Sequence, residues 1–202
     1  INLKKKYPKS NILILEKGSL PQGASTKNAG FACFGSVSEI LSDLEHHTEE
    51  EVVRLVQKRW NGIQRLRSLL GDSNIGFQLH GSHELFPLEK PGFYEKCLES
   101  VPYLNSLMEP VFEKKPFITN GNLFGFGSIQ EKYITHRLEG QLDTGIMMRS
   151  LIQKCLSMEI PILNGVMVND VVESNNGATI VTDGFEFSSK KVFVATNGFA
   201  SK

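Results

Sequence analysis

Four aliphatic residues run directly into an acid in the stretch Asn11-Ile12-Leu13-Ile14-Leu15-Glu16-Lys17-Gly18. A continuous apolar run of this length predicts a buried parallel strand, with Glu16 at its carboxyl end. In an open α/β sheet, an acid at that place accepts hydrogen bonds from the ribose hydroxyls of a nucleotide. Most strands that end in Glu-Lys bind nothing, so the stretch predicts an α/β fold more firmly than it predicts a nucleotide.

The loop after this strand is made of small and hydroxyl-bearing residues, Gly23-Ala24-Ser25-Thr26-Lys27-Asn28-Ala29-Gly30. Residues without bulk let backbone N–H groups approach a pyrophosphate closely, provided that a helix starts nearby. Strand and loop together predict a dinucleotide cofactor. An acid at the end of such a strand also suits NAD, so a nicotinamide-dependent oxidoreductase is an alternative.

Residues 15–18 and 23–31 resemble the second strand and the following loop of the D-amino-acid oxidase-like family of FAD-dependent oxidoreductases, which includes glycine oxidase, sarcosine oxidase and D-amino-acid dehydrogenase. The resemblance implies FAD as the cofactor. It implies that Glu16 binds the adenosine ribose and that Ser25 and Thr26 bind the phosphates. The remaining FAD contacts that it implies in this region are Lys17, Gly23, Ala24 and, towards the flavin, Asn28, Ala29 and Gly30.

Three later segments resemble the same family in the same order. Residues 166–171 are similar to the strand whose valine reads the adenine edge through its backbone, a role that would fall on Val168. Residues 192–198 resemble the strand and turn that close over the phosphates and ribose. This second likeness places FAD contacts at Ala195, Thr196 and Gly198. Residues 137–145 resemble the junction that returns the chain to the FAD domain, where Asp143 is also a good helix N-cap.

Both ends of the chain have the pattern of a cut unit. Residues 1–8 read as the tail of a helix, whereas a Rossmann unit places a first strand and a G-x-G-x-x-G turn before that helix. We expect the coding sequence upstream of Ile1 to encode both. We also expect the 202-residue chain alone to bind FAD poorly and to oxidise no amine, because the phosphate turn and the distal substrate residues of the family lie outside it.

Composition narrows the classes of partner. The chain has 202 residues, 40% of them hydrophobic, and 22 basic residues balance 22 acidic ones, so no net field favours nucleic acid or an anionic membrane. No apolar run reaches the roughly 20 residues of a membrane span. Cys33, Cys97 and Cys155 are odd in number and widely spaced, which favours reduced thiols and a cytoplasmic location.

The predicted fold class is α/β: an incomplete Rossmann-like FAD-binding domain interrupted by a mixed α+β substrate lobe with antiparallel strands. We assign residues 1–35 and 143–202 to the FAD-binding domain and residues 36–142 to the helical connection and inserted lobe. Apolar spacing and a capping box at Thr48 and Glu51 predict a long helix over 48–70, with Trp60 in the core. The other expected helices are 36–44, 93–107 (weakened by Pro102) and 144–158, the last with Ile146, Met147, Leu151, Ile152, Cys155 and Leu156 inward.

Alternation and turn signals predict the strands. In the lobe we expect a strand pair at 76–80 and 82–86 around Gly81, and a further pair within 117–126. Near the end we expect strands at 160–163, 166–172 and 191–195, the last one buried, and a hairpin whose turn is Asp183-Gly184.

The histidines and serines do not indicate a metal site or a hydrolase. His80 and His83 face opposite sides of a strand and no further ligand completes a set, so we expect no metal site. Ser25 and Ser82 lack a neighbouring base, which argues against a hydrolase. The predicted lobe strands could line a substrate pocket, with His80, Glu84 and Asn122 as its polar groups, or they could be the core of the lobe.

The implied function is oxidation of the C–N bond of an amino acid or related amine, by hydride transfer to FAD. The partner is a small-molecule amine or amino acid. Two alternatives remain: a non-catalytic relative that keeps the fold as a binding subunit, and a nicotinamide-dependent oxidoreductase, against which the inserted lobe argues.

Overall fold

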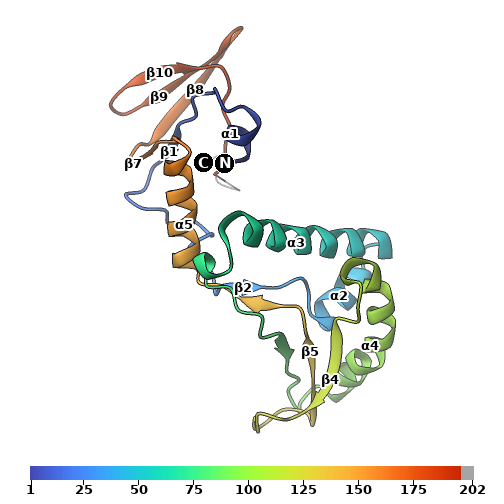
Figure 1. Cartoon of the computed structure of the whole chain (residues 1–202). Coiled ribbons are helices and arrows are strands. Elements are labelled where there is room, and N and C mark those ends of the chain that lie inside the picture. Colours follow the sequence, from blue (N-terminus) through green and yellow to red (C-terminus); the bar gives the residue numbers. More distant parts are fainter. Residues whose placement is uncertain (197–202) are drawn as a thin grey trace. The chain divides into compact units, whose positions relative to one another are not determined.

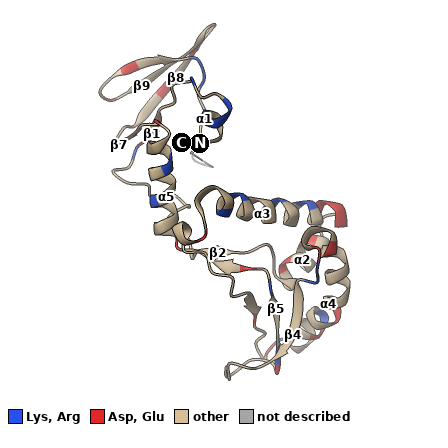
Figure 2. Ribbon diagram, in the orientation of Figure 1, with Lys and Arg blue, Asp and Glu red and all other residues tan. Residues whose placement is uncertain are grey.

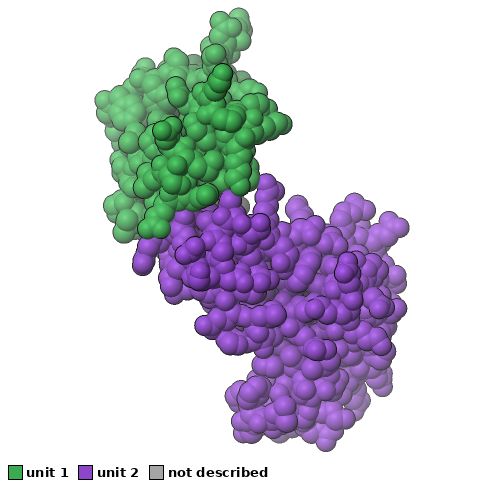
Figure 3. Space-filling view, in the orientation of Figure 1, with its two compact units in different colours: residues 1–27, 152–202 green, residues 28–151 purple. Residues whose placement is uncertain are grey.

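The computed structural model describes residues 1–196 and divides into two compact units. Unit 1 comprises residues 1–27 and 152–202, and unit 2 comprises residues 28–151; they are the green and purple parts of Figure 3. Each unit has its own core. Ile160 and Ile180 are buried in unit 1, whereas a larger apolar cluster around Leu104 and Met108 fills unit 2.

Unit 1 begins with the short helix α1 (Asn2–Lys6) and contains a parallel pair of strands, β1 (Ile14–Glu16) and β7 (Ile162–Asn164), in which Glu16 pairs with Asn164. The predicted parallel strand is confirmed, but its predicted burial is wrong. Ile14 is 37% exposed, because β7 is its single strand neighbour within residues 1–196 and a two-stranded sheet is too narrow to be covered on both faces.

A three-stranded antiparallel meander completes unit 1 (Figure 1). It runs β8 (Val168–Ser174), β9 (Gly177–Thr182) and β10 (Glu186–Ser189), with β9 in the middle. The predicted hairpin with its Asp183-Gly184 turn is confirmed as the β9–β10 connection. The register shifts by one residue between Val168 and Asp170, which is a β-bulge at the start of β8.

The strand predicted at 191–195 is wrong. Residues 191–196 have no regular secondary structure, and Phe193 and Val194 are each 67% exposed. The apolar run has the composition of a sheet strand, but it pairs with none of the strands within residues 1–196. Gly198 lies outside the described residues.

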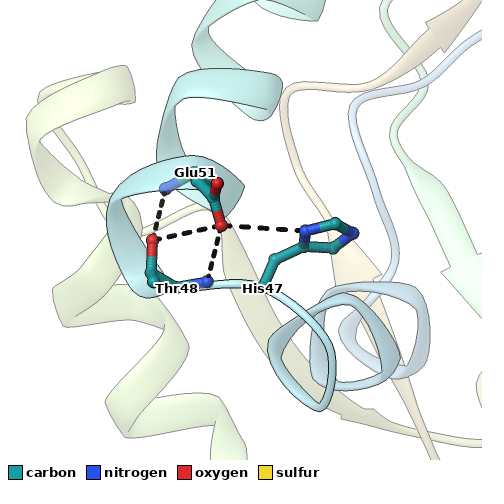
Figure 4. Close-up of polar contacts among 3 residues, drawn as sticks. All are labelled: His47, Thr48 and Glu51. Carbon is teal, nitrogen blue, oxygen red and sulfur yellow. Dashed lines mark hydrogen bonds and ion pairs between the residues drawn. The ribbon is translucent and has the colours of Figure 1, made fainter.

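Three helices form one side of unit 2: α2 (Val37–Leu44), α3 (Glu49–Leu70) and α4 (Pro91–Phe112). The predicted capping box of α3 is confirmed, because the Thr48 hydroxyl accepts from the Glu51 N–H and the Glu51 carboxylate accepts from the Thr48 N–H (Figure 4). His47 lies 3.7 Å from the same carboxylate. Acidic residues occupy the first turn of α3 and basic residues lie further along it (Figure 2), an arrangement that complements the helix dipole.

Helix α4 is longer than predicted and continues through Pro102 and Pro110. A proline inside a helix removes one backbone hydrogen bond and crowds the preceding turn. Burial compensates, because one face of α4 lies in the core of unit 2. Its buried residues are Tyr94, Cys97, Val101, Leu104, Asn105, Met108, Val111 and Phe112. Trp60 of α3 packs edge-on against Phe112, with 5.2 Å between the ring centroids, which confirms the prediction that Trp60 lies in the core.

Two strand predictions in unit 2 are wrong in their pairing. The three-stranded sheet has the order β3 (Ser82–Glu84), β5 (Lys132–His136), β4 (Phe117–Gly121). Residues 76–80 do not pair with 82–86, and 117–126 contains one strand instead of two. The local sequence patterns located β3 and β4, but they could not reveal β5, the distant strand that pairs with both.

A short antiparallel ribbon joins β2 (Phe31–Ala32) to β6 (Gly140–Gln141), and Gln78 bridges to the far side of Gln141. The 3-10 turn η1 (Ser73–Ile75) precedes this bridge. Helix α5 (Thr144–Ser157) follows β6. The predicted N-cap of α5 is confirmed, since Asp143 Oδ1 accepts from the Ile146 N–H at 2.8 Å. Of the six side chains predicted inward on α5, Cys155 is buried, but Ile146 and Leu156 are 37% and 55% exposed.

Within residues 1–196, no helix combines the length and the apolar character needed to cross a bilayer.

All three cysteines are free thiols. Cys33 is exposed, but partial desolvation raises the pKa of its thiol to about 11, with Glu139 and Glu39 adding to the effect, so this thiol is protonated at neutral pH.

Candidate functional site

The acid at the end of β1 lies in a backbone turn that holds its carboxylate. Glu16 Oε1 accepts a hydrogen bond from the N–H of Gly18 at 2.8 Å. Any side chain at Gly18 would crowd the Leu20 carbonyl and this carboxylate oxygen, which explains the glycine. A carboxylate has about four acceptor sites, so one bond to Gly18 leaves acceptor capacity for the hydroxyls of a ribose.

The segment that follows β7 is bonded to the same turn. The Val166 N–H donates to the Glu16 carbonyl at 3.1 Å, and the Gly165 N–H donates to the Gly18 carbonyl at 2.9 Å. Val168 begins β8 two residues further on and is 40% exposed. Unit 1 therefore brings together the predicted ribose acid and the segment leading to the predicted adenine-reading strand, although some 150 residues separate them in sequence.

The small-residue loop forms a single hydrogen-bonded turn between residues 23 and 27. The N–H groups of Thr26 and Lys27 both donate to the Gly23 carbonyl, at 3.0 and 3.2 Å. The Thr26 hydroxyl lies 2.9 Å from that carbonyl, so its one proton is used inside the turn in this state. No helix starts in the loop; the next one along the chain, α2, begins at Val37.

The last three residues of the loop belong to unit 2. Gly30 has φ +75°, and a Cβ there would overlap the Leu142 carbonyl. The Leu142 N–H donates to the Gly30 carbonyl at 2.8 Å, and Asn28 Oδ1 accepts from the Gly30 N–H at 2.9 Å. Gly30 is thus a glycine for two steric reasons, which its resemblance to a cofactor loop did not reveal.

The remaining predicted contacts fall into two groups. Lys17, Ala24, Ser25, Ala195 and Thr196 are exposed residues of unit 1, and Ala29 is an exposed residue of unit 2. All six are accessible to a ligand.

Sequence reasoning missed a buried carboxylate, Glu139, which is 2% exposed. Its Oε1 accepts from the N–H groups of Phe34 and Gly35, the latter at 3.1 Å, and its Oε2 accepts from the Ser82 hydroxyl. A buried charge needs several hydrogen bonds, and three donors supply them here. The signal in the sequence was a lone acid between apolar and small residues, in Leu138-Glu139-Gly140.

Beside Glu139 lies a histidine held in its neutral form. His136 is 3% exposed among the rings of Phe34, Phe112 and Phe117, and its Nδ1 accepts from the Leu138 N–H at 3.3 Å. Burial lowers the pKa of His136 below its usual value, and Glu139 only partly opposes this. The unfolded chain takes up a proton near pH 6.5, whereas the folded chain resists it.

We expect acid to destabilise unit 2 through His136. Its contribution is complete above pH 6.5 and is lost as the pH falls from 6.5 towards the lowered pKa of the folded state, by up to about 1.4 kcal/mol per pH unit. In His136→Asn, whose amide oxygen can still accept from Leu138, this part of the slope should vanish. Urea unfolding at pH 8, 6.5 and 5 measures it, with the exposed His47→Asn as control. Equal slopes in wild type and His136→Asn would refute the assignment.

A cluster of polar side chains lies on one face of the β3–β5–β4 sheet. Thr135 Oγ1 lies 2.9 Å from His83 Nδ1 and accepts from Asn120 Nδ2 at 2.7 Å. The ring of Phe124 lies 5.1 Å from that of His83 and stacks on Tyr133 at 5.8 Å. His83 and Phe124 are exposed, so this face offers an imidazole, an amide and an aromatic ring to a ligand.

The three polar groups predicted for a pocket each have a hydrogen-bond partner within unit 2. Glu84 accepts from the Ser38 N–H in the first turn of α2, and burial raises its pKa. Asn122 bonds the backbone of Phe126, and His80 bonds Gln78. Residues 1–196 hold no group of three acidic, histidine or cysteine side chains placed to bind a metal.

A family model described as FAD dependent oxidoreductase (DAO) matches residues 2–202, and the chain belongs to this family. The fold class is accordingly the α/β fold of FAD-binding oxidoreductases, and FAD is the cofactor of the family.

Solved structures of similar fold agree. Glycine oxidase from Bacillus cereus ATCC 14579 superposes with a TM-score of 0.62 at 16% identity, covering 91% of this chain and 49% of that one. L-amino acid deaminase from Proteus vulgaris gives 0.64 at 14% identity (93% and 41% covered), and iminodiacetate oxidase from Chelativorans sp. BNC1 gives 0.62 at 15% (90% and 47%). The chain spans about half the length of these relatives. No curated protein sequence matches it.

Proposed function

We propose that the protein oxidises the C–N bond of an amino acid or related amine, with unit 1 binding the adenosine half of FAD. The observation that carries the proposal is the pair of backbone bonds from Gly165 and Val166 to residues 16–18, which joins the ribose acid to the segment leading to Val168. When bound, FAD supplies the hydride acceptor.

The residues of unit 1 fit the adenosine half of this cofactor. Glu16 offers acceptors to the ribose hydroxyls, and an adenine edge needs only backbone N–H and C=O groups, which the exposed start of β8 can present at its bulge. The turn at residues 23–27 provides exposed small residues for the phosphates. For the hydroxyl of Thr26 to donate to a phosphate, it must rotate away from the Gly23 carbonyl.

We further propose that the β3–β5–β4 sheet of unit 2 binds the substrate, because one of its faces presents an imidazole, an amide and an exposed aromatic ring. His83 and Asn120 are the side chains whose polar atoms could orient the amine or the carboxylate. The apolar part of a substrate would contact Phe124, which is 56% exposed.

The domain division follows from these proposals: residues 1–35 and 143–202 form the FAD-binding domain and residues 36–142 the substrate lobe. The free thiols favour a cytoplasmic location.

The test of function is spectroscopic. The protein as its gene encodes it should be purified with flavin absorbance, and anaerobic addition of amino acids or N-methyl amino acids one at a time should bleach it. A protein without flavin, or a flavin that no amine reduces, would contradict the proposal and would favour a binding subunit.

The proposed substrate-binding face of this sheet has its own test. Asn120→Ala should lower kcat/KM by about two- to tenfold and by different factors for different amines, because one hydrogen bond is worth about 0.5–1.5 kcal/mol. Flavin content should stay unchanged. Asn122→Ala, which loses only its bonds to Phe126, is the matched control. Identical substrate preference in both variants would assign the sheet face to structure alone.

A further inference from the structure

Glu139 binds the chain where the predicted cofactor loop continues into unit 2. Gly30 ends that loop, β2 follows, and the Phe34 and Gly35 N–H groups come next and donate to the Glu139 carboxylate. The carboxylate also accepts from Ser82 at the start of β3. One buried side chain thus joins three segments that are distant in sequence.

The peptide group between Phe34 and Gly35 lies between opposite charges. Its N–H donates to the Glu139 carboxylate at 3.1 Å, and its C=O accepts from Arg59 Nη1 of α3 at 3.0 Å. Both charges are aligned with the dipole of the peptide, so each polarises the group and strengthens the hydrogen bond of the other. Glu139 and Arg59 are therefore coupled through the backbone that they hold.

We call the Glu139 and Arg59 side chains, which hold the Phe34–Gly35 peptide, the clamp. A short antiparallel ribbon joins the clamp to the loop. The ribbon between them pairs Phe31 with Gln141 and Ala32 with Gly140, and it begins with the Leu142 N–H bonded to Gly30. A ribbon of two residue pairs has little stability of its own. Its geometry therefore depends on the contacts at its two ends. At one end Gly30 packs against the Leu142 carbonyl, and at the other the Glu139 carboxylate binds the N–H groups of Phe34 and Gly35.

We propose that Glu139, together with Arg59, is a positioning residue that fixes residues 28–35 in the conformation that receives the cofactor. Glu139 touches no cofactor; it acts through the backbone that it binds. The inference rests on the proposed function, since it takes residues 28–30 as part of the FAD site.

Amide hydrogen exchange tests the clamp without any cofactor. Glu139→Gln keeps the size and can keep all three hydrogen bonds, but it removes the charge. We expect exchange at residues 30–35 to quicken about tenfold relative to the rest of unit 2, and a similar local change in Arg59→Met. Because the two residues act on one peptide, the double variant should be no faster than the faster single variant, whereas independent residues would multiply their effects.

FAD affinity tests the positioning role. We expect Glu139→Gln to weaken FAD binding about tenfold in the protein as its gene encodes it. Asn105→Ala is the matched control, because Asn105 is also buried in unit 2 and also binds two backbone groups, the N–H and the C=O of Phe117. It should lower the stability of unit 2 and leave FAD affinity unchanged.

The outcomes separate the two proposals. A wild-type protein that binds no FAD would contradict the proposed function. A wild type that binds FAD, with Glu139→Gln unchanged in affinity or no weaker than Asn105→Ala, would overturn the positioning role alone. Multiplicative exchange rates in the double variant would overturn the coupling of Glu139 to Arg59.

Discussion

Gly30→Ala should destabilise unit 2 by about 2–5 kcal/mol. The φ of Gly30 is +75°, where an L residue loses roughly 1–2 kcal/mol, and the added Cβ would overlap the Leu142 carbonyl. A backbone carbonyl cannot swing away as a flexible side chain does, so the ribbon must shift, at a further cost of about 1–3 kcal/mol. Urea unfolding measures the sum.

Gly125→Ala is the matched control for this prediction. Gly125 has φ +64°, close to that of Gly30, but no atom lies within 4 Å of its added Cβ. It therefore reports the conformational cost alone, about 1–2 kcal/mol. Equal losses in the two variants would show that the close approach of Gly30 to Leu142 contributes nothing.

Glu16→Ala should weaken FAD binding about tenfold to a hundredfold. Charge-assisted hydrogen bonds to the ribose hydroxyls contribute about 1.5–3 kcal/mol, which corresponds to that range of affinity. The measurement is the flavin that remains after dialysis, together with a titration of the stripped protein.

Two further variants separate the charge from the fold. Glu16→Gln keeps an acceptor for the Gly18 N–H and should lose less affinity than Glu16→Ala. Glu173→Ala removes an exposed acid of β8 in the same unit and should change nothing. Flavin retention in Glu16→Ala equal to that of the wild type would remove Glu16 from the site.

Local sequence signals predicted the elements that local physics determines. The capping box at Thr48, the N-cap at Asp143 and the Asp183-Gly184 turn each depend on residues within a few positions of one another. The long helix over 48–70 followed from its apolar spacing, and the parallel strand at Glu16 from its aliphatic run.

Long-range pairing was beyond those signals. Alternation in residues 76–86 suggested a local hairpin, yet β3 pairs with β5 some 50 residues away. The role of Glu139 depends on donors about 105 and 57 positions distant, which no spacing rule contains. The strand predicted over 191–195 shows the same limit, because a suitable composition does not by itself determine pairing with a distant strand.

The cofactor site was predicted by resemblance more than by pattern. The aliphatic run and its acid indicate one end of the proposed site, and the structure adds the bonds from Gly165 and Val166 that join the two halves of unit 1. The loop at 23–30 has the predicted small residues, but Gly30 and Asn28 are also explained by their bonds within unit 2.

The most direct measurement is a titration with FAD of the isotope-labelled protein as its gene encodes it, followed by backbone amide NMR. The account predicts saturable shifts centred on Glu16, Lys17 and Gly18 and on residues 166–168, with the shifts at 16–18 lost in Glu16→Ala. Binding of FAD that leaves both segments unperturbed would contradict it.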